Sequence, residues 1–258
     1  MLTAIGRKAT TPLSFLGEVV LIIFRSFLEL RGVLRIDFRP VARVLLKQIL
    51  FTGVHAWAVI VALFFLIGTL IITQIIFFAG AEGAPLIGMV LVWVVVREVG
   101  PVLTAVIVIA RSGAAVAAEL ASMKINDELW ALEMMGIPAT RYLVMPRVLG
   151  MAVSVTLLTL YAELVAINGG FFVGSIIWNI PFAEFQQGLV QFSTLREIFI
   201  SLLKSFVFGL AIAAVCCYQG LSVEGGATQI PVAATKGVMR SLLLVFVIDA
   251  VAALVTFR

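Results

Sequence analysis

Charge, histidine and cysteine are all scarce in this chain. Asp, Glu, Lys and Arg together make up 12% of its 258 residues, His55 is the single histidine, and the two cysteines, Cys216 and Cys217, are adjacent. One histidine cannot supply paired haem ligands or a His-rich metal site. Adjacent cysteines do not form an ordinary disulfide with each other, so we interpret this pair as small core residues. The sequence therefore supports no metal, haem or redox function.

Motifs for nucleotide binding and covalent catalysis are absent as well. The sequence contains no G-x-x-x-x-G-K-[ST] loop, and the stretch Gly225-Gly226-Ala227-Thr228 lacks the lysine that reaches the phosphates. It also contains no Ser/His/Asp set, no paired histidine and no acidic metal motif. We therefore expect a protein that is not an enzyme and holds no cofactor, so that nucleotide chemistry comes from a partner. No apolar leader with a cleavage site is seen, and no removed signal peptide is expected.

Long apolar runs dominate what is present. Hydrophobic residues make up 62% of the chain and the mean hydropathy is +1.18, whereas soluble domains are about half apolar. Runs of about 20 apolar residues span a bilayer as helices, while barrel strands alternate over about 10 residues. The sequence predicts an all-α integral membrane protein with one transmembrane domain over residues 1–258. The predicted spans are 54–78, 86–110, 148–167, 198–218 and 241–257.

Glycine, proline and asparagine mark the expected connections between these spans. We expect a tight loop at 80–85, a longer irregular connection after the third span that is marked by Asn168-Gly169-Gly170 and Asn179-Ile180-Pro181, and a glycine-containing loop from Gly220 to Pro231.

Residues 11–40 are predicted to form an interfacial amphipathic helix followed by a basic linker, lying on the membrane rather than across it. Ser14, Glu18, Arg25 and Glu29 recur on one polar face, and apolar residues fill the other positions. The basic residues of the linker and of the approach to the first span suit an anionic lipid surface; they are Arg31, Arg35, Arg39, Arg43 and Lys47. Nucleic-acid binding is a weaker interpretation, because no stacking aromatic residues are interleaved.

The distribution of basic residues predicts the orientation. Most of the 18 Lys and Arg residues lie before the first span, in the segment 111–147 and just before the fifth span. Under the positive-inside rule these regions are cytoplasmic. We therefore expect a cytoplasmic N-terminus and a periplasmic C-terminus.

Five ionisable residues fall inside the predicted spans, namely Arg97, Glu98, Glu163, Lys204 and Asp249. Charges inside a membrane are costly and are functional-site candidates by default. Neighbouring residues on a helix point about 100° apart, so Arg97 and Glu98 are expected to seek different helices. We expect Asp249 to pair with Arg97 and Lys204 with Glu98. Either the charges line a cavity and act in transport, or they only order the bundle.

Residues 126–136 are predicted to form a short helix outside the membrane. Asn126 is the expected N-cap, Asp127 and Glu128 lie in the first turn, and Gly136 ends the helix. Its predicted apolar edge consists of Leu129, Leu132 and Met135, widened by Trp130 and Met134. So short a helix is marginal alone. It is therefore expected to pack either in a groove of a cytoplasmic ATPase or on the membrane and the loops of this protein.

Several spaced motifs carry a resemblance to a known family. In chain order they are Arg97-Glu98-x-Gly100-Pro101, Arg111-Ser112-Gly113, Ala118-Glu119-Leu120, Met123-Lys124, Asp127-Glu128, Ala131-Leu132-Glu133-x-Met135-Gly136, Pro146-Arg147, Cys217-Tyr218-x-Gly220-Leu221, Gly225-Gly226-Ala227, Thr235 and Val247-x-Asp249. With these motifs the chain resembles the MlaE/YrbE permease family of ABC transporters over nearly its whole length. It departs from the family pattern at Ala110, Trp130 and Pro138. Trp130 stands where the family usually has Asp, which puts a polar contact to the ATPase there in doubt.

The resemblance implies a homodimeric permease in the bacterial inner membrane that moves phospholipids between membranes. Its implied partners are a cytoplasmic ATPase, which binds ATP and Mg²⁺, a hexameric periplasmic MCE-domain protein and a STAS-domain protein, with no nucleic acid. The expected substrate or gating residues are Arg97, Glu98, Glu163, Lys204 and Asp249. The expected ATPase-coupling residues are Asp127, Glu128, Leu129, Trp130, Leu132, Glu133 and Met135.

The leading hypothesis is that a phospholipid binds between two copies of the chain, with its acyl chains against apolar walls and the intramembrane charges gating or orienting it. The alternative is an ion-coupled carrier or channel in which these charges relay protons. A membrane-embedded enzyme is disfavoured, because the catalytic residue sets are missing.

Overall fold

The computed structural model describes residues 12–36, 39–80, 84–192 and 194–256, and every regular element in these ranges is a helix. The elements are α1 (Pro12–Ile36), α2 (Arg39–Ala79), α3 (Ala84–Val90), η4 (Leu91–Val99), α4 (Gly100–Val108), η5 (Ile109–Gly113), α5 (Ala114–Ile125), α6 (Glu128–Met134), η6 (Thr140–Val144), α7 (Met145–Trp178), α8 (Phe182–Phe192), α9 (Leu195–Leu221) and α10 (Gln229–Thr256). The η segments are π-helical, with hydrogen bonds to the carbonyl five residues back. The all-α prediction is confirmed.

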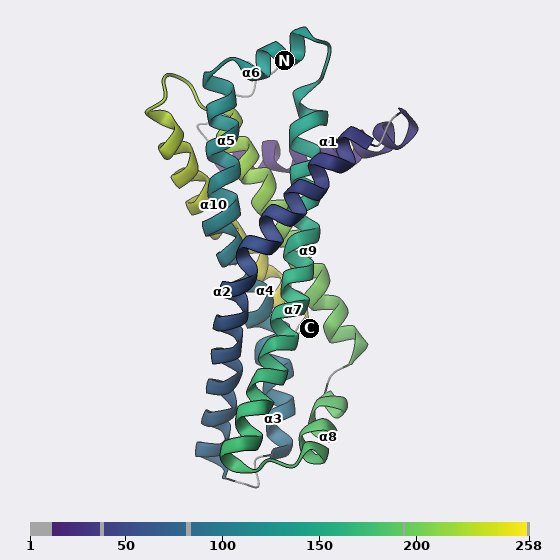
Figure 1. The fold of residues 1–258 in the computed structure, drawn as a ribbon, viewed down its shortest axis with the longest axis vertical. Coiled ribbons are helices and arrows are strands. Elements are labelled where there is room, and N and C mark those ends of the chain that lie inside the picture. The colour runs from purple at the N-terminus through teal and green to yellow at the C-terminus, as the bar shows by residue number, and fades with distance from the viewer. Residues whose placement is uncertain (1–11, 37–38, 81–83, 193, 257–258) are drawn as a thin grey trace.

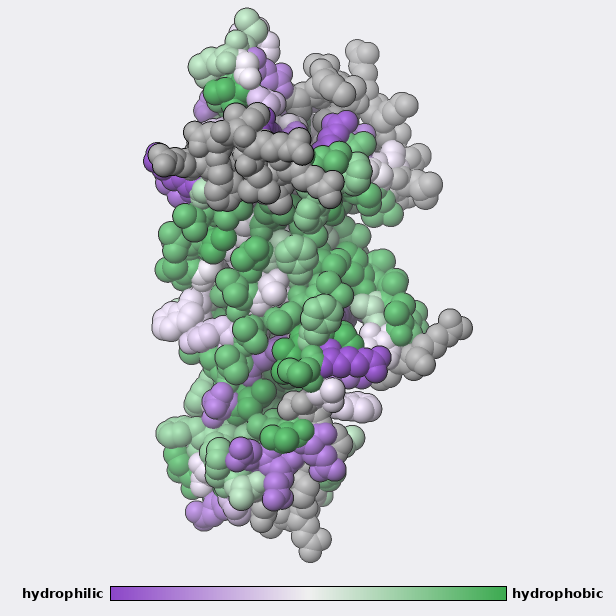
Figure 2. Space-filling model, turned by 90° about the vertical axis from the view of Figure 1, so that its right-hand side faces the viewer, coloured by the Kyte–Doolittle hydropathy of each residue, from purple (hydrophilic) through white to green (hydrophobic). Residues whose placement is uncertain are grey.

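Five helical segments of the described chain are long and apolar enough to cross a membrane, as predicted. They are Ala42–Phe78, Leu86–Ile125, Thr140–Trp178, Leu195–Leu221 and Gln229–Thr256. Each covers its predicted span and extends it, although residue 257 and residues 81–83 of the predicted tight loop lie outside the described ranges. The molecule is elongated along these segments, with α6 at one end and α3 and α8 at the other (Figure 1). Hydrophobic residues cover the middle of the face in Figure 2, and hydrophilic residues gather nearer its ends.

The irregular connection predicted at Asn168-Gly169-Gly170 is wrong, because α7 continues through it. A Cβ atom at Gly68 of α2 would lie 2.0 Å from the carbonyl oxygen of Ala166, and one at Gly170 would lie 2.7 Å from the carbonyl oxygen of Gly68. Small residues let two membrane helices approach this closely. Gly170 therefore serves the contact between α2 and α7, not a turn.

The other predicted connections are also more helical than expected. Residues 179–181 are irregular as predicted, with Asn179 in the left-handed conformation, but α8 then occupies much of the rest of the predicted irregular connection. The predicted glycine loop is shortened from both sides, since α9 continues through Gly220 and α10 begins at Gln229. Pro231 then lies in the first turn of α10, where its missing N–H removes no helical hydrogen bond. The predicted basic linker is helical from Arg39 on, because α2 begins there.

The helix predicted before the first span is confirmed for residues 12–36. This helix, α1, crosses the other helices at an angle (Figure 1). Its Phe15 ring meets the Tyr218 ring of α9 edge-on at 5.4 Å between centroids, and the Arg240 guanidinium of α10 lies 4.8 Å from the Phe15 centroid. Val20 and Phe24 remain exposed on α1. One side of α1 is thus anchored to the bundle while apolar side chains stay uncovered, as on an interfacial helix.

The second membrane segment is one helical run, α3 to α5, interrupted by the π-helical segments η4 and η5. Arg97 and Glu98 lie in η4. At the end of η4 the Gly100 N–H donates to the Val95 carbonyl, and the next residue, Pro101, has no N–H to donate. π-Helical turns are often found at functional sites. The backbone therefore departs from α geometry where two adjacent charges enter the bundle.

Candidate functional site

Lys204 is the centre of the charged cluster inside the bundle. Its Nζ lies 2.7 Å from Oε2 of Glu98 and 2.5 Å from Oδ1 of Asp249. The Lys204 side chain is 4% exposed, whereas those of Glu98 and Asp249 are 33% and 20% exposed. One buried ammonium group thus joins η4, α9 and α10, and the cluster reaches the protein surface through its two carboxylates.

The predicted pair of Glu98 and Lys204 is confirmed, but the predicted pair of Arg97 and Asp249 is wrong. Asp249 is held by Lys204 instead. A lysine ammonium has three donors on a flexible stem, so it can bond two carboxylates at once. Helical spacing predicts that the side chains of Arg97 and Glu98 point in different directions. It does not predict which helix packs against α10, and therefore which residue pairs with Asp249.

Arg97 lies beside the cluster on the same π-helical segment. Its guanidinium lies 5.7 Å from the ring centroid of Trp93, and the residue is 9% exposed. The Arg97 carbonyl accepts a hydrogen bond from Lys204 Nζ at 3.2 Å. In an α-helix that carbonyl would accept from the N–H of residue 101, which is proline and has none. Lys204 therefore also bonds the backbone at the junction between η4 and α4.

Glu163 on α7 is buried behind this junction. It is 3% exposed, and Ser201 Oγ on α9 donates to its Oε1 at 2.5 Å. A Cβ atom at Gly100 would lie 3.1 Å from Glu163 Cγ and 2.7 Å from the Val95 carbonyl oxygen. Only glycine fits between them without a shift of either neighbour. The structure thus brings Glu163 to the same junction as the charged cluster, through Gly100 and Ser201.

The second candidate site is the short helix α6, at one end of the molecule. This helix has fewer residues than predicted, and its N-cap residue differs from the predicted one. It begins at Glu128, and its N-cap is Asp127, which has a left-handed backbone (φ 58°) and makes no side-chain capping hydrogen bond. Asn126 is therefore not the N-cap. Gly136 ends the helix as predicted, in the left-handed conformation (φ 78°), with its N–H bonded to the Glu133 carbonyl at 3.0 Å.

The two faces of α6 have different surroundings. Leu129 is buried and Leu132 is half-buried against the core of this chain. Trp130, Met134 and Met135 are 64%, 69% and 66% exposed. The predicted edge of Leu129, Leu132 and Met135 is thus split, because its two leucines face the protein's own core. The exposed surface of α6 consists of Trp130, Met134 and Met135, with Asp127, Glu128 and Glu133 around them.

Several contacts that tie the α6 end to the spans were not predicted. Lys124 Nζ donates to the Leu221 carbonyl at 2.6 Å, joining the ends of α5 and α9. The buried Arg147 guanidinium of α7 pairs with Glu119 of α5 at 2.9 Å. Lys124, Glu119 and Arg147 belong to the sequence motifs noted above, but spacing alone gave them no partners. These contacts connect α5, α7 and α9 at the end of the bundle that carries α6.

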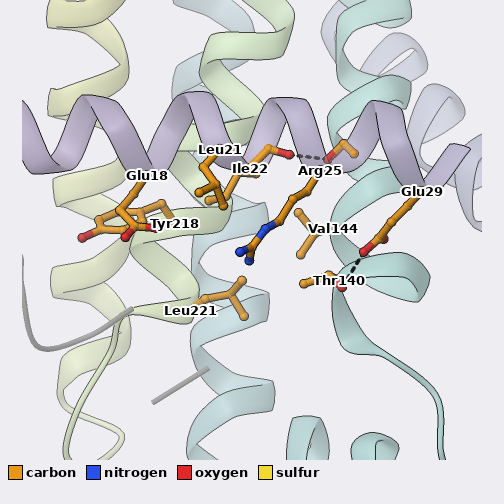
Figure 3. Close-up of a pocket in the computed structure, with 10 residues that line it drawn as sticks. Glu18, Leu21, Ile22, Arg25, Glu29, Thr140, Val144, Tyr218 and Leu221 are labelled. Carbon is orange, nitrogen blue, oxygen red and sulfur yellow. Dashed lines mark hydrogen bonds between the residues drawn. The ribbon is translucent and has the colours of Figure 1, made fainter. Parts of the chain in front are cut away.

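A small cavity separates α1 from η6 and α9 at this end (Figure 3). Arg25 extends into it, and Thr140 Oγ1 donates to Glu29 Oε1 at 2.9 Å across its edge. Its volume is about 30 Å³, which is enough for a few water molecules at most. The cavity therefore does not accommodate a lipid or a nucleotide. Nor do the described residues contain a group of three His, Cys, Asp or Glu side chains placed to hold a metal ion.

Comparison with known proteins gives a consistent result. A family model described as Permease MlaE matches residues 45–255. A probable ABC transporter permease protein of Rickettsia typhi is 31% identical over 204 residues, which is 79% of each chain. One of Synechocystis is 37% identical over 161 residues, 62% of this chain and 61% of the relative. One of Pyropia yezoensis is 30% identical over 177 residues, 69% of this chain and 67% of the relative.

Proposed function

Because this chain belongs to the MlaE permease family of ABC transporters, we propose that it moves phospholipids between the bacterial inner membrane and a periplasmic MCE-domain carrier. The observation that carries the proposal is the cluster of Lys204, Glu98 and Asp249, which is set among apolar helices and reaches the surface. A phospholipid combines a charged headgroup with apolar chains. A site with both signs of charge on an apolar wall offers complementary contacts to each part.

The surface beside this cluster supports a site between two copies of the chain. Few residues of α10, which carries Asp249, are buried within this chain. Its exposed large apolar residues include Leu243, Phe246, Val247, Val251 and Leu254. A second copy set against α10 would cover these residues and leave the two carboxylates facing a shared cavity. In that arrangement the acyl chains lie against the apolar wall, and the charges gate the cavity or orient the headgroup.

The ATPase is proposed to dock on α6. An ABC permease works with an ATPase, and the sequence contains no phosphate-binding loop of its own. Trp130 and Met134 are exposed on α6 and lie four residues apart, on one face. Exposed aromatic and methionine side chains are enriched at protein interfaces. ATP and Mg²⁺ would be bound by the partner. Movement of α6 would be transmitted to the spans through the contacts of Lys124 and Arg147 at that end.

The positions of the other partners are also proposals, which rest on the family and on the difference between the two ends of the molecule. We propose that the end with α6 is cytoplasmic and that the end with α3 and α8 is periplasmic. α8 exposes Gln186, Gln187 and Gln191 around a shallow groove, which offers hydrogen-bonding groups to a hexameric MCE-domain protein. A STAS-domain protein would join on the cytoplasmic side.

Lipid transfer by the reconstituted complex tests the proposal. We predict that Glu98→Ala abolishes ATP-stimulated transfer of phospholipid from liposomes to the MCE-domain protein, while the complex still assembles. Glu224→Ala is the matched control, because Glu224 is exposed in the loop before α10 and is not an ion-pair partner of Lys204. Wild-type transfer by an assembled Glu98→Ala complex would refute the role of the cluster. Transport that requires a proton gradient and does not depend on ATP would favour the alternative of an ion-coupled carrier.

A further inference from the structure

Glu163 is enclosed by three helices and has one hydrogen-bond partner among the described residues. α4 approaches it with Gly100, α9 with Ser201, and Glu163 itself is in the middle of α7. Only 3% of the residue is exposed. Its carboxyl group is therefore almost fully removed from water.

No lysine or arginine in the described chain forms an ion pair with Glu163. Lys204, three residues after Ser201 on α9, bonds Glu98 and Asp249. Arg97 lies over Trp93. Two further ionisable groups lie on the nearby part of α9. Arg196 is exposed and forms no ion pair with Glu163, and Glu197, one turn before Ser201, is an acid as well. No cation is thus positioned to compensate a negative charge on Glu163.

An ionised carboxylate needs more hydrogen-bond donors or positive charge than this site supplies. It offers about four acceptor positions, and one serine hydroxyl fills one of them. An isolated charge in an apolar interior is so costly that the group takes up a proton instead. A neutral carboxyl group, by contrast, is satisfied by few hydrogen bonds.

The charge balance of the surrounding cluster leads to the same result. Arg97 and Lys204 carry two positive charges, and Glu98 and Asp249 carry two negative ones. These four charges cancel without Glu163. A third carboxylate would leave an excess negative charge inside a bundle that has few polar groups to stabilise it.

We propose that Glu163 is a proton-binding site, which stays protonated in the assembled transporter and links α7 to α9 as a neutral hydrogen-bonding group. Ser201 donates to the carbonyl oxygen of the acid, and Gly100 gives the carboxyl group room. The inference concerns the protonation of this side chain and is independent of which molecule the transporter carries.

Infrared spectroscopy of the purified complex at neutral pH tests the proposal directly. We expect a carbonyl stretching band of a protonated carboxylic acid that is present in the wild type and is lost in Glu163→Gln. Glu224→Gln, which alters an exposed carboxylate, must leave the band unchanged. A wild-type spectrum without a band assignable to Glu163 would overturn the proposal, whether or not the complex transfers lipid.

Stability of the same complexes provides a second measurement. Glutamine keeps the shape and the neutral polar character of a protonated glutamate, so Glu163→Gln is expected to unfold within about 2 °C of the wild type. Glu163→Ala removes the hydrogen bond and leaves a cavity, so it is expected to unfold at least about 5 °C lower. Equal losses in Glu163→Gln and Glu163→Ala would show that the negative charge is required, and would overturn the proposal.

Discussion

Lys204 places one ammonium group between two carboxylates of different helices. Its contacts with Glu98 and Asp249 are short, and its side chain is almost fully buried. Such clusters contribute little net stability compared with apolar packing, but removal of one partner leaves an uncompensated charge and costs about 3–5 kcal/mol. Because the side chains of Glu98 and Asp249 are partly exposed to solvent, we expect the loss of stability to lie at the lower end of that range. Lys204 therefore determines where both acids lie.

This role predicts a specific pattern of rescue. Lys204→Met is expected to lower the free energy of unfolding by about 3 kcal/mol, because Glu98 and Asp249 then lose the cation that they share. Addition of Glu98→Gln and Asp249→Asn should restore most of that loss, since both negative charges are removed. Thermal unfolding of the purified permease measures both. A triple variant no more stable than Lys204→Met would show that the ion pairs do not account for the role of Lys204.

At the scale of the elements, the two faces of α6 have different roles: one packs against the core of this chain, and the other is free to contact a partner. Leu129 and Leu132 contact the core of this chain, so a charge at either position would damage the permease itself. Trp130 and Met134 are exposed, and their replacement leaves the core intact. The exposed face is therefore where the interaction with an ATPase can be tested without unfolding the spans.

We predict that Trp130→Asp and Met134→Asp each weaken binding of the ATPase while the permease still inserts and folds. Loss of an aromatic anchor from an interface typically costs 2 kcal/mol or more, which is about thirtyfold in affinity. Glu128→Lys is expected to act in the same direction by reversing a charge in the first turn. Pull-down of the ATPase with solubilised permease measures the effect, and Gln187→Asp, at an exposed position on α8 at the other end of the molecule, serves as the control. Unchanged binding by all three α6 variants would show that α6 is not the docking helix.

At the scale of the whole molecule, the described chain has two distinct ends along its long axis. α6 and the loop between α9 and α10 lie at one end, and α8 lies at the other (Figure 1). Segments of this length and apolarity cross a bilayer with their ends on opposite sides. The excess of basic residues at the α6 end favours the cytoplasm for that end.

This orientation predicts which introduced cysteines react with an impermeant thiol reagent in cells whose outer membrane has been opened. Gln187→Cys on α8 is expected to be labelled, and Thr228→Cys in the loop before α10 is expected to be protected until the inner membrane is lysed. Cys216 and Cys217 are fully buried, so the native background should be low. Labelling of Thr228→Cys and protection of Gln187→Cys would reverse the orientation. Gly83, another candidate position for a label, lies outside the described residues.

Composition and local periodicity determined the class of this protein and the location of its spans. Apolar runs of sufficient length have no stable alternative to helices in a membrane, so five spans were predictable, as were the five ionisable residues within them. The closing role of Gly136 also followed from local chemistry, because left-handed backbone favours glycine. These features depend on residues close together in the chain.

Packing between distant segments decided the rest. The sequence predicts a break at Gly170, whereas the close approach of α2 makes this residue a helix contact. The sequence places Leu132 in a docking edge, whereas the core of the chain partly covers it. The sequence predicts that Asp249 pairs with Arg97, whereas α9 brings Lys204 to it. A sequence shows which side chains share a helix face, but the neighbour of that face is set by how the helices pack against one another, so partners across helices become visible only in the tertiary structure.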